Sequence, residues 1–152
     1  MTKLSGAIVL LLAGALVGAA CERVVGIPET PGAIRIEMGD FFFRPASITL
    51  KHGEKVTLRL VNTSAVEHDF AIGRRADAAA GRYEEDFFDN VKVASSGRVR
   101  VARDGGTLRV FVAPLGTAEI TFTVPDVTGS FESACFIAGH YQSGMKGTLL
   151  VE

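Results

Sequence analysis

Several residue types are scarce in this chain of 152 residues. It has no tryptophan and only two cysteines, three histidines and three methionines, and its 16 Lys and Arg nearly balance 17 Asp and Glu. Because no long basic run occurs, nucleic-acid binding is not expected. Cys21 directly follows an apolar N-terminal run, which leaves Cys135 as the single thiol of the remaining chain. An internal disulfide is therefore not expected either.

Strand-forming residues are abundant instead. Val, Ile, Thr and Phe recur, and apolar and polar residues alternate in segments such as 33–38 and 56–62. This pattern, punctuated by Gly and Pro, predicts about eight strands at hairpin-like spacing. We predict an all-β domain over residues 33–152, a Greek-key β-sandwich or barrel with one core. The charged segment 73–90, which includes a run of alanines, predicts a loop with a short helix.

The N-terminus has a composition of its own. Lys3 is the only charge in residues 1–20, and the uncharged run is short for a membrane span, which needs roughly 20 residues. A basic start, an apolar middle and small residues before Cys21 predict a secretory signal peptide. The stretch VGAAC resembles the lipobox of bacterial lipoproteins, although Gly18 stands where that motif prefers Leu.

This resemblance implies that Cys21 is acylated and anchors the mature protein to a membrane outside the cytoplasm. Ordinary cleavage near Ala20 and an uncleaved anchor remain the alternatives. Residues 21–32 then comprise the lipidated cysteine and a linker, because they hold two prolines and no clear period.

One short loop concentrates the scarce residues. In ACFIAGHYQSGMKG, Cys135, His140 and Met145 follow one another at five-residue steps. A thiolate, an imidazole and a thioether together favour copper, because thioether is a soft ligand that zinc does not usually take. An unpaired thiol in an oxidising compartment would also be prone to oxidation unless a metal occupied it. One further histidine would complete a blue-copper ligand set.

Two other histidines are available for that position. His52 lies in the polar turn KHGEK and is interpreted as a solvated residue, whereas His68 lies where a loop enters a predicted strand. Because a strand end is a rigid platform for a ligand, His68 is the preferred candidate.

Two stretches resemble the cupredoxin family of blue copper proteins. FFFRPASITLKHGEKVTLRLVNTSAVEHDF is similar to its N-terminal half, and GTAEITFTVPDVTGSFESACFIAGHYQSGMKGTLLV to its C-terminal half. The likeness covers residues 33–152 except a variable region at 73–106, and the ligand-loop spacing is similar to that of rusticyanin, auracyanin and plastocyanin. It implies one mononuclear copper ion held by four ligands, namely His68, Cys135, His140 and Met145.

The resemblance also implies supporting roles for two further residues. Asn62 lies on the strand before His68, and Asp69 stands where many family members have Asn or Ser. We expect the Asp69 carboxylate to accept hydrogen bonds from backbone N–H groups of the Cys135 loop. Its negative charge is expected to lower the reduction potential.

Three classes of function compete for such a site, namely electron transfer, catalysis, and copper carriage or storage. Catalysis is not expected, because Ala134 and Phe136 flank Cys135 where copper oxidases and nitrite reductases place a relaying histidine, and none is left for a second centre. Copper carriage or storage usually needs Met- and His-rich clusters, but Met38 is isolated and Met1 lies in the signal. This class remains the alternative.

The sequence therefore predicts a monomeric, membrane-anchored periplasmic electron carrier. Its expected partners are redox proteins, such as a cytochrome or a membrane oxidoreductase. By family likeness, electrons would pass through the solvent-facing edge of His140, beside Ala138 and Tyr141. Residues 74–106 are either a second partner surface or an elaborated loop.

Overall fold

The structure, a computed structural model, describes residues 27–152. The predicted signal peptide at 1–20, the lipidation site Cys21 and the linker as far as residue 26 lie outside the described residues. Within residues 27–152, no helix has the length and apolar character needed to cross a membrane.

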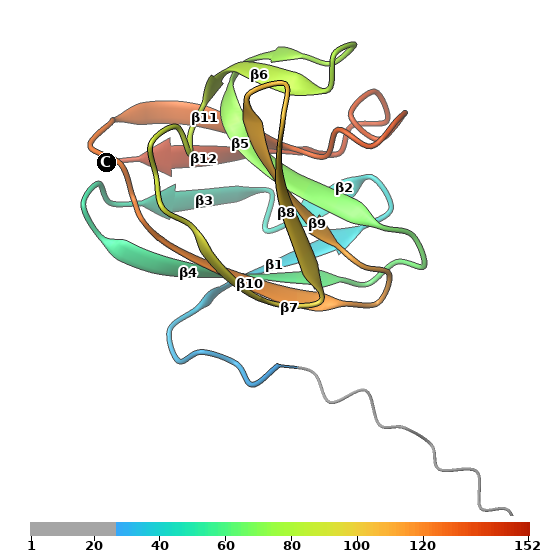
Figure 1. The fold of residues 1–152 in the computed structure, drawn as a ribbon, viewed down its shortest axis with the longest axis horizontal. Coiled ribbons are helices and arrows are strands. Elements are labelled where there is room, and N and C mark those ends of the chain that lie inside the picture. Colours follow the sequence, from blue (N-terminus) through green and yellow to red (C-terminus); the bar gives the residue numbers. More distant parts are fainter. Residues whose placement is uncertain (1–26) are drawn as a thin grey trace, which may run out of the picture.

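The described residues form twelve strands joined by turns and loops (Figure 1). They are β1 (Ile34–Gly39), β2 (Phe42–Arg44), β3 (Ser47–Leu50), β4 (Lys55–Asn62), β5 (His68–Asp77), β6 (Arg82–Asp86), β7 (Ala94–Gly97), β8 (Val99–Asp104), β9 (Thr107–Val112), β10 (Thr117–Thr123), β11 (Gly129–Ala134) and β12 (Lys146–Val151). The predicted all-β class is confirmed. The count exceeds the expected eight because the short strands β2, β3, β6 and β7 flank or extend the longer ones.

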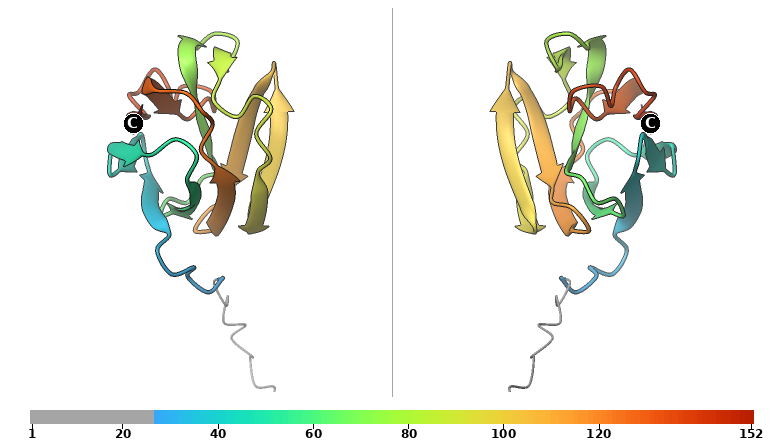
Figure 2. Two further views of the ribbon diagram at one scale, coloured as in Figure 1. Left: turned by 90° about the vertical axis from the view of Figure 1, so that its left-hand side faces the viewer. Right: turned by 90° about the vertical axis from the view of Figure 1, so that its right-hand side faces the viewer.

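The strands form two sheets that face each other (Figure 2). One sheet has the order β2-β1-β4-β10-β7, and the other has the order β3-β12-β11-β5-β9-β8, with β6 added alongside β5. Pairing is antiparallel except for β1 with β4 and β3 with β12. The loop after β11 lies at the opposite end of the sandwich from the C-terminus (Figure 1). We call this the loop end.

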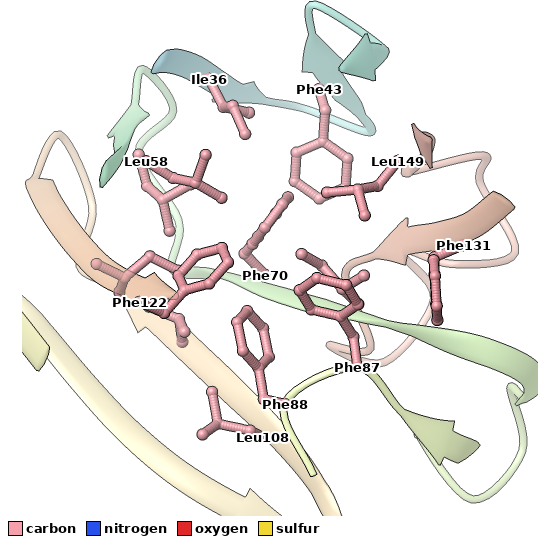
Figure 3. Packing of buried hydrophobic residues seen from close by; sticks show 14 of the residues in the cluster. Ile36, Phe43, Leu58, Phe70, Phe87, Phe88, Leu108, Phe122, Phe131 and Leu149 are labelled. Carbon is pink, nitrogen blue, oxygen red and sulfur yellow. The ribbon is translucent and has the colours of Figure 1, made fainter. Parts of the chain in front are cut away.

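The apolar faces of both sheets meet in one core (Figure 3). Phenylalanine rings pack among its aliphatic side chains, and Phe88 packs edge-on against Phe87 and Phe122 at centroid separations of 5.2 and 5.1 Å. Such edge-to-face geometry is the favoured arrangement of aromatic pairs. Cys135 and Met145 belong to the same cluster, so the core extends to the loop end.

The segment 73–90 differs from the prediction. It contains no helix, because β5 continues to Asp77, turns, and returns as β6. The turn passes through Gly81 at φ 65°, a left-handed conformation that glycine adopts without a steric cost. Tyr83 of β6 is buried and packs edge-on against Phe136 at 5.0 Å. Tertiary packing of this ring therefore overrides the helical propensity of the alanine run.

The described end of the predicted linker is in contact with the domain. The carbonyls of Ile27 and Pro28 accept hydrogen bonds from Arg59 at 2.9 and 3.2 Å. Thr30 Oγ1 donates to Glu119 Oε2 at 2.6 Å, and Arg59 pairs with the other carboxylate oxygen at 2.7 Å. The chain is thus held against the outer face of β4 and β10 from Ile27 onward.

Candidate metal centre

Three chain segments meet at the loop end. His68 is the first residue of β5, and Cys135 directly follows β11, the antiparallel neighbour of β5. His140 and Met145 lie on the loop between β11 and β12. Because β5 and β11 pair with Ala71 opposite Ala134, the start of one strand and the end of the other are brought together.

The ligand loop is folded tightly on itself. The backbone N–H of Met145 donates to the His140 carbonyl at 3.0 Å, and the Cys135 N–H donates to the Met145 carbonyl at 3.1 Å. Gly139 and Gly144 have φ values of 85° and 95°, which suit glycine and let the loop reverse direction. These turns explain why a cysteine, a histidine and a methionine separated by five residues can gather at one point.

The donor atoms of three predicted ligands converge. Cys135 Sγ lies 3.4 Å from His140 Nδ1 and 4.0 Å from His68 Nδ1, and the two Nδ1 atoms are 3.1 Å apart. Bonds of about 2.0–2.3 Å to nitrogen and sulfur, about 120° apart, would separate such donors by roughly 3.5–3.8 Å. The observed distances bracket this range, so the three side chains fit a single metal ion in a trigonal arrangement.

Met145 is placed beside this cluster by its backbone and is fully buried. A buried thioether next to a thiol and two imidazoles is the donor set that favours copper over zinc. His52, by contrast, lies in the turn between β3 and β4, half exposed and 3.2 Å from Asp126. It is not part of the cluster.

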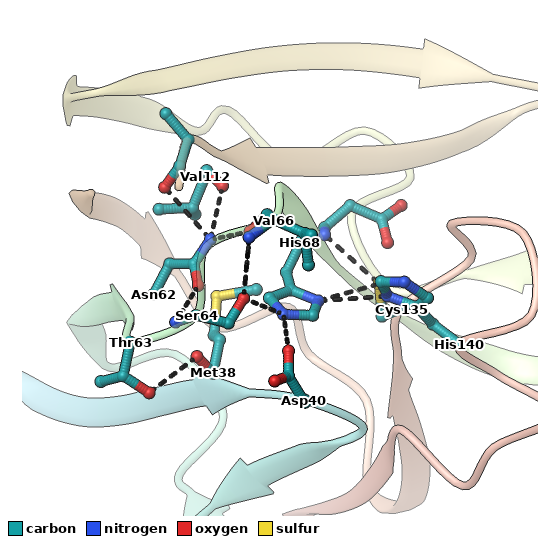
Figure 4. A network of polar contacts seen from close by, with 12 residues as sticks. Met38, Asp40, Asn62, Thr63, Ser64, Val66, His68, Val112, Cys135 and His140 are labelled. Carbon is teal, nitrogen blue, oxygen red and sulfur yellow. Dashed lines mark hydrogen bonds and ion pairs between the residues drawn. The ribbon is translucent and has the colours of Figure 1, made fainter. Parts of the chain in front are cut away.

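The orientation of His68 is set by a residue that the sequence analysis did not identify. Ser64 Oγ lies 2.8 Å from His68 Nε2 (Figure 4). This contact leaves Nδ1 directed at the other donors, and a partner on the far ring nitrogen is what usually fixes the tautomer of a ligating histidine. A serine four residues before a histidine in a loop carries no distinctive signal, so only the fold reveals it.

Asn62 organises the loop that carries Ser64. Its Nδ2 lies 2.7 Å from the Val66 carbonyl and 3.1 Å from those of Val112 and Ala113. Its Oδ1 accepts the Ser64 backbone N–H at 2.9 Å. The buried Asn62 side chain therefore connects the β4–β5 loop to the β9–β10 loop (Figure 4).

Asp69 lies directly behind the cysteine. Its Oδ1 accepts the Phe136 N–H at 2.7 Å, and its own backbone N–H donates to Cys135 Sγ at 3.4 Å. The structure thus contains the predicted type of contact from the Cys135 loop. It also contains a partner that was not predicted, since Arg109 Nε donates to Asp69 Oδ2.

Burial sets the proton affinities of the site. Burial, together with a smaller contribution from the Asp69 carboxylate, raises the pKa of the Cys135 thiol to about 12. Burial also lowers the pKa of His68, and His140 lowers it further, while Asp40 and Asp69 oppose this shift without reversing it. The metal-free protein at neutral pH therefore holds a protonated thiol, and a metal that binds must displace this proton.

Fold and site together define a small β-sandwich protein with a mononuclear metal centre. No family model matches the chain. It is 34% identical over 119 residues to the copper-resistant cuproprotein CopI of Rubrivivax gelatinosus and 29% identical over 176 positions to that of Pseudomonas aeruginosa. These matches cover 78% and 94% of this chain, and the chain spans 65% and 94% of the respective relatives.

A solved structure of another protein has a similar fold. The dithionite-reduced auracyanin of Roseiflexus castenholzii superposes with a TM-score of 0.57 at 25% identity, covering 82% of this chain and 99% of that chain. The fold and the donor set are those of the cupredoxins, the family of blue copper proteins. Copper is therefore the metal that its cysteine, histidine and methionine donors serve.

Proposed function

We propose that the protein shuttles single electrons between redox partners, with copper held by His68, Cys135, His140 and Met145. The convergence of Cys135 Sγ and both Nδ1 atoms within 4.8 Å of one another is the observation that carries this proposal. When bound, copper supplies the one-electron couple. The chain supplies ligands that backbone hydrogen bonds and burial hold in place, so that little has to reorganise when an electron moves.

Residues around His140 suit transient docking. Ala138 and Gly139 are exposed beside the half-buried His140. The exposed Phe41 ring meets the His140 ring edge-on, with 5.3 Å between their centroids. Leu115 is the most exposed large apolar side chain described. It lies in the β9–β10 loop, and its backbone N–H donates to the Ser64 carbonyl at 3.0 Å. An apolar surface beside a ligand favours weak, short-lived complexes, which suit an electron carrier.

Two measurements test this function. The purified full chain loaded with Cu(II) should show an intense band at roughly 600 nm that bleaches on reduction and is missing in Cys135→Ser. Ala138→Glu should keep the band but slow electron exchange with a redox partner, because the charge lies beside His140. A colourless wild-type protein would refute the blue copper site, and unchanged exchange in Ala138→Glu would refute the proposed exit face.

Copper handling is the second candidate function. The relatives are named copper-resistant cuproproteins, which favours a role in binding surplus copper. Among residues 27–152, however, the only group of three or more potential metal ligands is the one built on Cys135. A carrier should release Cu(I) to a competing chelator rapidly, whereas an electron carrier should retain it through repeated oxidation and reduction.

For location, we propose an extracytoplasmic protein that is anchored through acylated Cys21. The apolar run before this cysteine and the copper-resistance relatives support the proposal. Electron carriage without an enzymatic activity follows from four protein ligands that leave no position for a substrate. The mass of the membrane-fraction protein tests the anchor, since an unmodified Cys21 would refute it.

A further inference from the structure

A buried ion pair lies directly behind the cysteine ligand. Asp69 is completely buried, and Arg109 of β9 is only 8% exposed. Arg109 Nε donates to Asp69 Oδ2, and its Nη1 donates to Asp104 Oδ2 at 3.0 Å. Asp104 is two-thirds exposed, so its charge is largely screened by solvent. The Asp69 carboxylate and the Arg109 guanidinium are thus the principal charge pair beside Cys135.

Each oxygen of the Asp69 carboxylate has a separate task. Oδ1 accepts the N–H of Phe136, the residue next to the cysteine, while Oδ2 is held by Arg109. A neutral amide such as Asn would suffice for the first task. The carboxylate requires a cation as well, because an uncompensated charge in a buried site is costly.

The variable region at 73–106 covers this ion pair, whereas Arg109 itself lies just beyond that region, on β9. Arg109 follows the β8–β9 turn, and the β5–β6 turn packs over it. A Cβ on Gly81 of that turn would lie 3.8 Å from Arg109 Nη1 and 3.7 Å from Phe136 Cβ. The β5–β6 and β8–β9 hairpins therefore exclude water from the ion pair, and a charge shielded from water acts more strongly on its neighbours.

We infer that Arg109 is a positioning and charge-compensating residue of the copper site. It holds the Asp69 carboxylate against the Phe136 amide and offsets the negative charge behind Cys135. The sequence alone predicts that Asp69 lowers the reduction potential. With Arg109 in place the two charges oppose each other, because a nearby cation favours the reduced, less positively charged site and a nearby anion favours the oxidised one.

The reduction potential of the blue band at pH 8 tests this role in four variants. Arg109→Met should lower the potential, Asp69→Asn should raise it, and Asp69→Asn with Arg109→Met should return it close to wild type. Arg100→Met is the matched control. Its guanidinium also lies over the Phe111 ring, at 3.6 Å against 4.8 Å for Arg109, but it is largely exposed. Its potential should hardly change.

A purely structural role would lower stability without shifting the potential in opposite directions. Shifts of the same sign in the two single variants, or no shift in either, would overturn the inference. If Arg109→Met does not fold, the difference between Asp69→Asn and the double variant still isolates the Arg109 charge, and equal potentials there would overturn it.

The metal-free protein provides an independent test of the positioning role of Arg109. Hydrogen exchange at the Phe136 amide should accelerate in Arg109→Met and stay at the wild-type rate in Arg100→Met. Equal rates would refute the positioning role. The inference rests on the proposed copper site, and the failures are distinguishable. A wild-type protein without a blue band refutes the proposed function, whereas a normal band with unmoved potentials refutes only the role of Arg109.

Discussion

Replacing Asn62 with alanine should destabilise the protein by about 3 kcal/mol. The side chain has four contacts, with the carbonyls of Val66, Val112 and Ala113 and with the Ser64 N–H. An amide has two N–H hydrogens, so the three carbonyls share two donors, and three full hydrogen bonds are a fair count. Each contributes about 1 kcal/mol net.

Thermal and urea unfolding of the metal-free protein would measure this loss. At roughly 3–4 °C per kcal/mol for a domain of this size, the midpoint should fall by about 10 °C. Thr57→Ala is a matched control on the same strand, because it removes a single bond, 2.8 Å long, to Thr121. It should cost only about 1 kcal/mol. If Asn62→Ala costs no more than Thr57→Ala, the reasoning that Asn62 connects two loops is wrong.

Two further predictions concern single hydrogen-bonding groups. Ser64→Ala removes the partner of His68 Nε2 and should weaken copper binding by about 10–100-fold in a chelator competition, whereas Ser143→Ala on the exposed ligand loop should not. An unchanged affinity would contradict the role of Ser64. For Glu119, burial raises the pKa, but hydrogen bonds from Thr30 and Arg59 outweigh burial and lower it. Its stabilisation is therefore present above the unfolded pKa of about 4.3 and lost as the pH falls through the lower folded value. Glu119→Gln should flatten this acid loss in urea unfolding, and an unaltered pH profile would contradict it.

Much of the fold was predictable from local patterns. Alternation in segments such as 56–62 predicted strands because side chains point alternately to the two faces of a sheet. The prediction failed at 73–90, where a run of alanines indicated a helix. There the decisive contact joins Tyr83 to Phe136, residues that are more than fifty positions apart. Local sequence contains no information on such a contact.

The residues of the candidate site also fall into two groups, those that could be identified from the sequence and those that could not. Cys135, His140 and Met145 were identifiable because their chemistry is rare in this chain and their spacing is regular. Ser64 and Arg109 were not, because serine and arginine are common and serve many purposes. Their roles come only from what they face, namely His68 Nε2 and Asp69 Oδ2.

By itself, the sequence determined the strand pattern, the copper-favouring donor set and the preference for His68 over His52, since each depends on residue type and local order. Tertiary structure decided which hydrogen bonds orient the donors and how the charge beside them is balanced. The expectation that the negative charge of Asp69 lowers the reduction potential shows the difference, because it took no account of Arg109. Arg109 lies forty positions further along the chain, and only the pairing of β5 with β9 brings the two charges together.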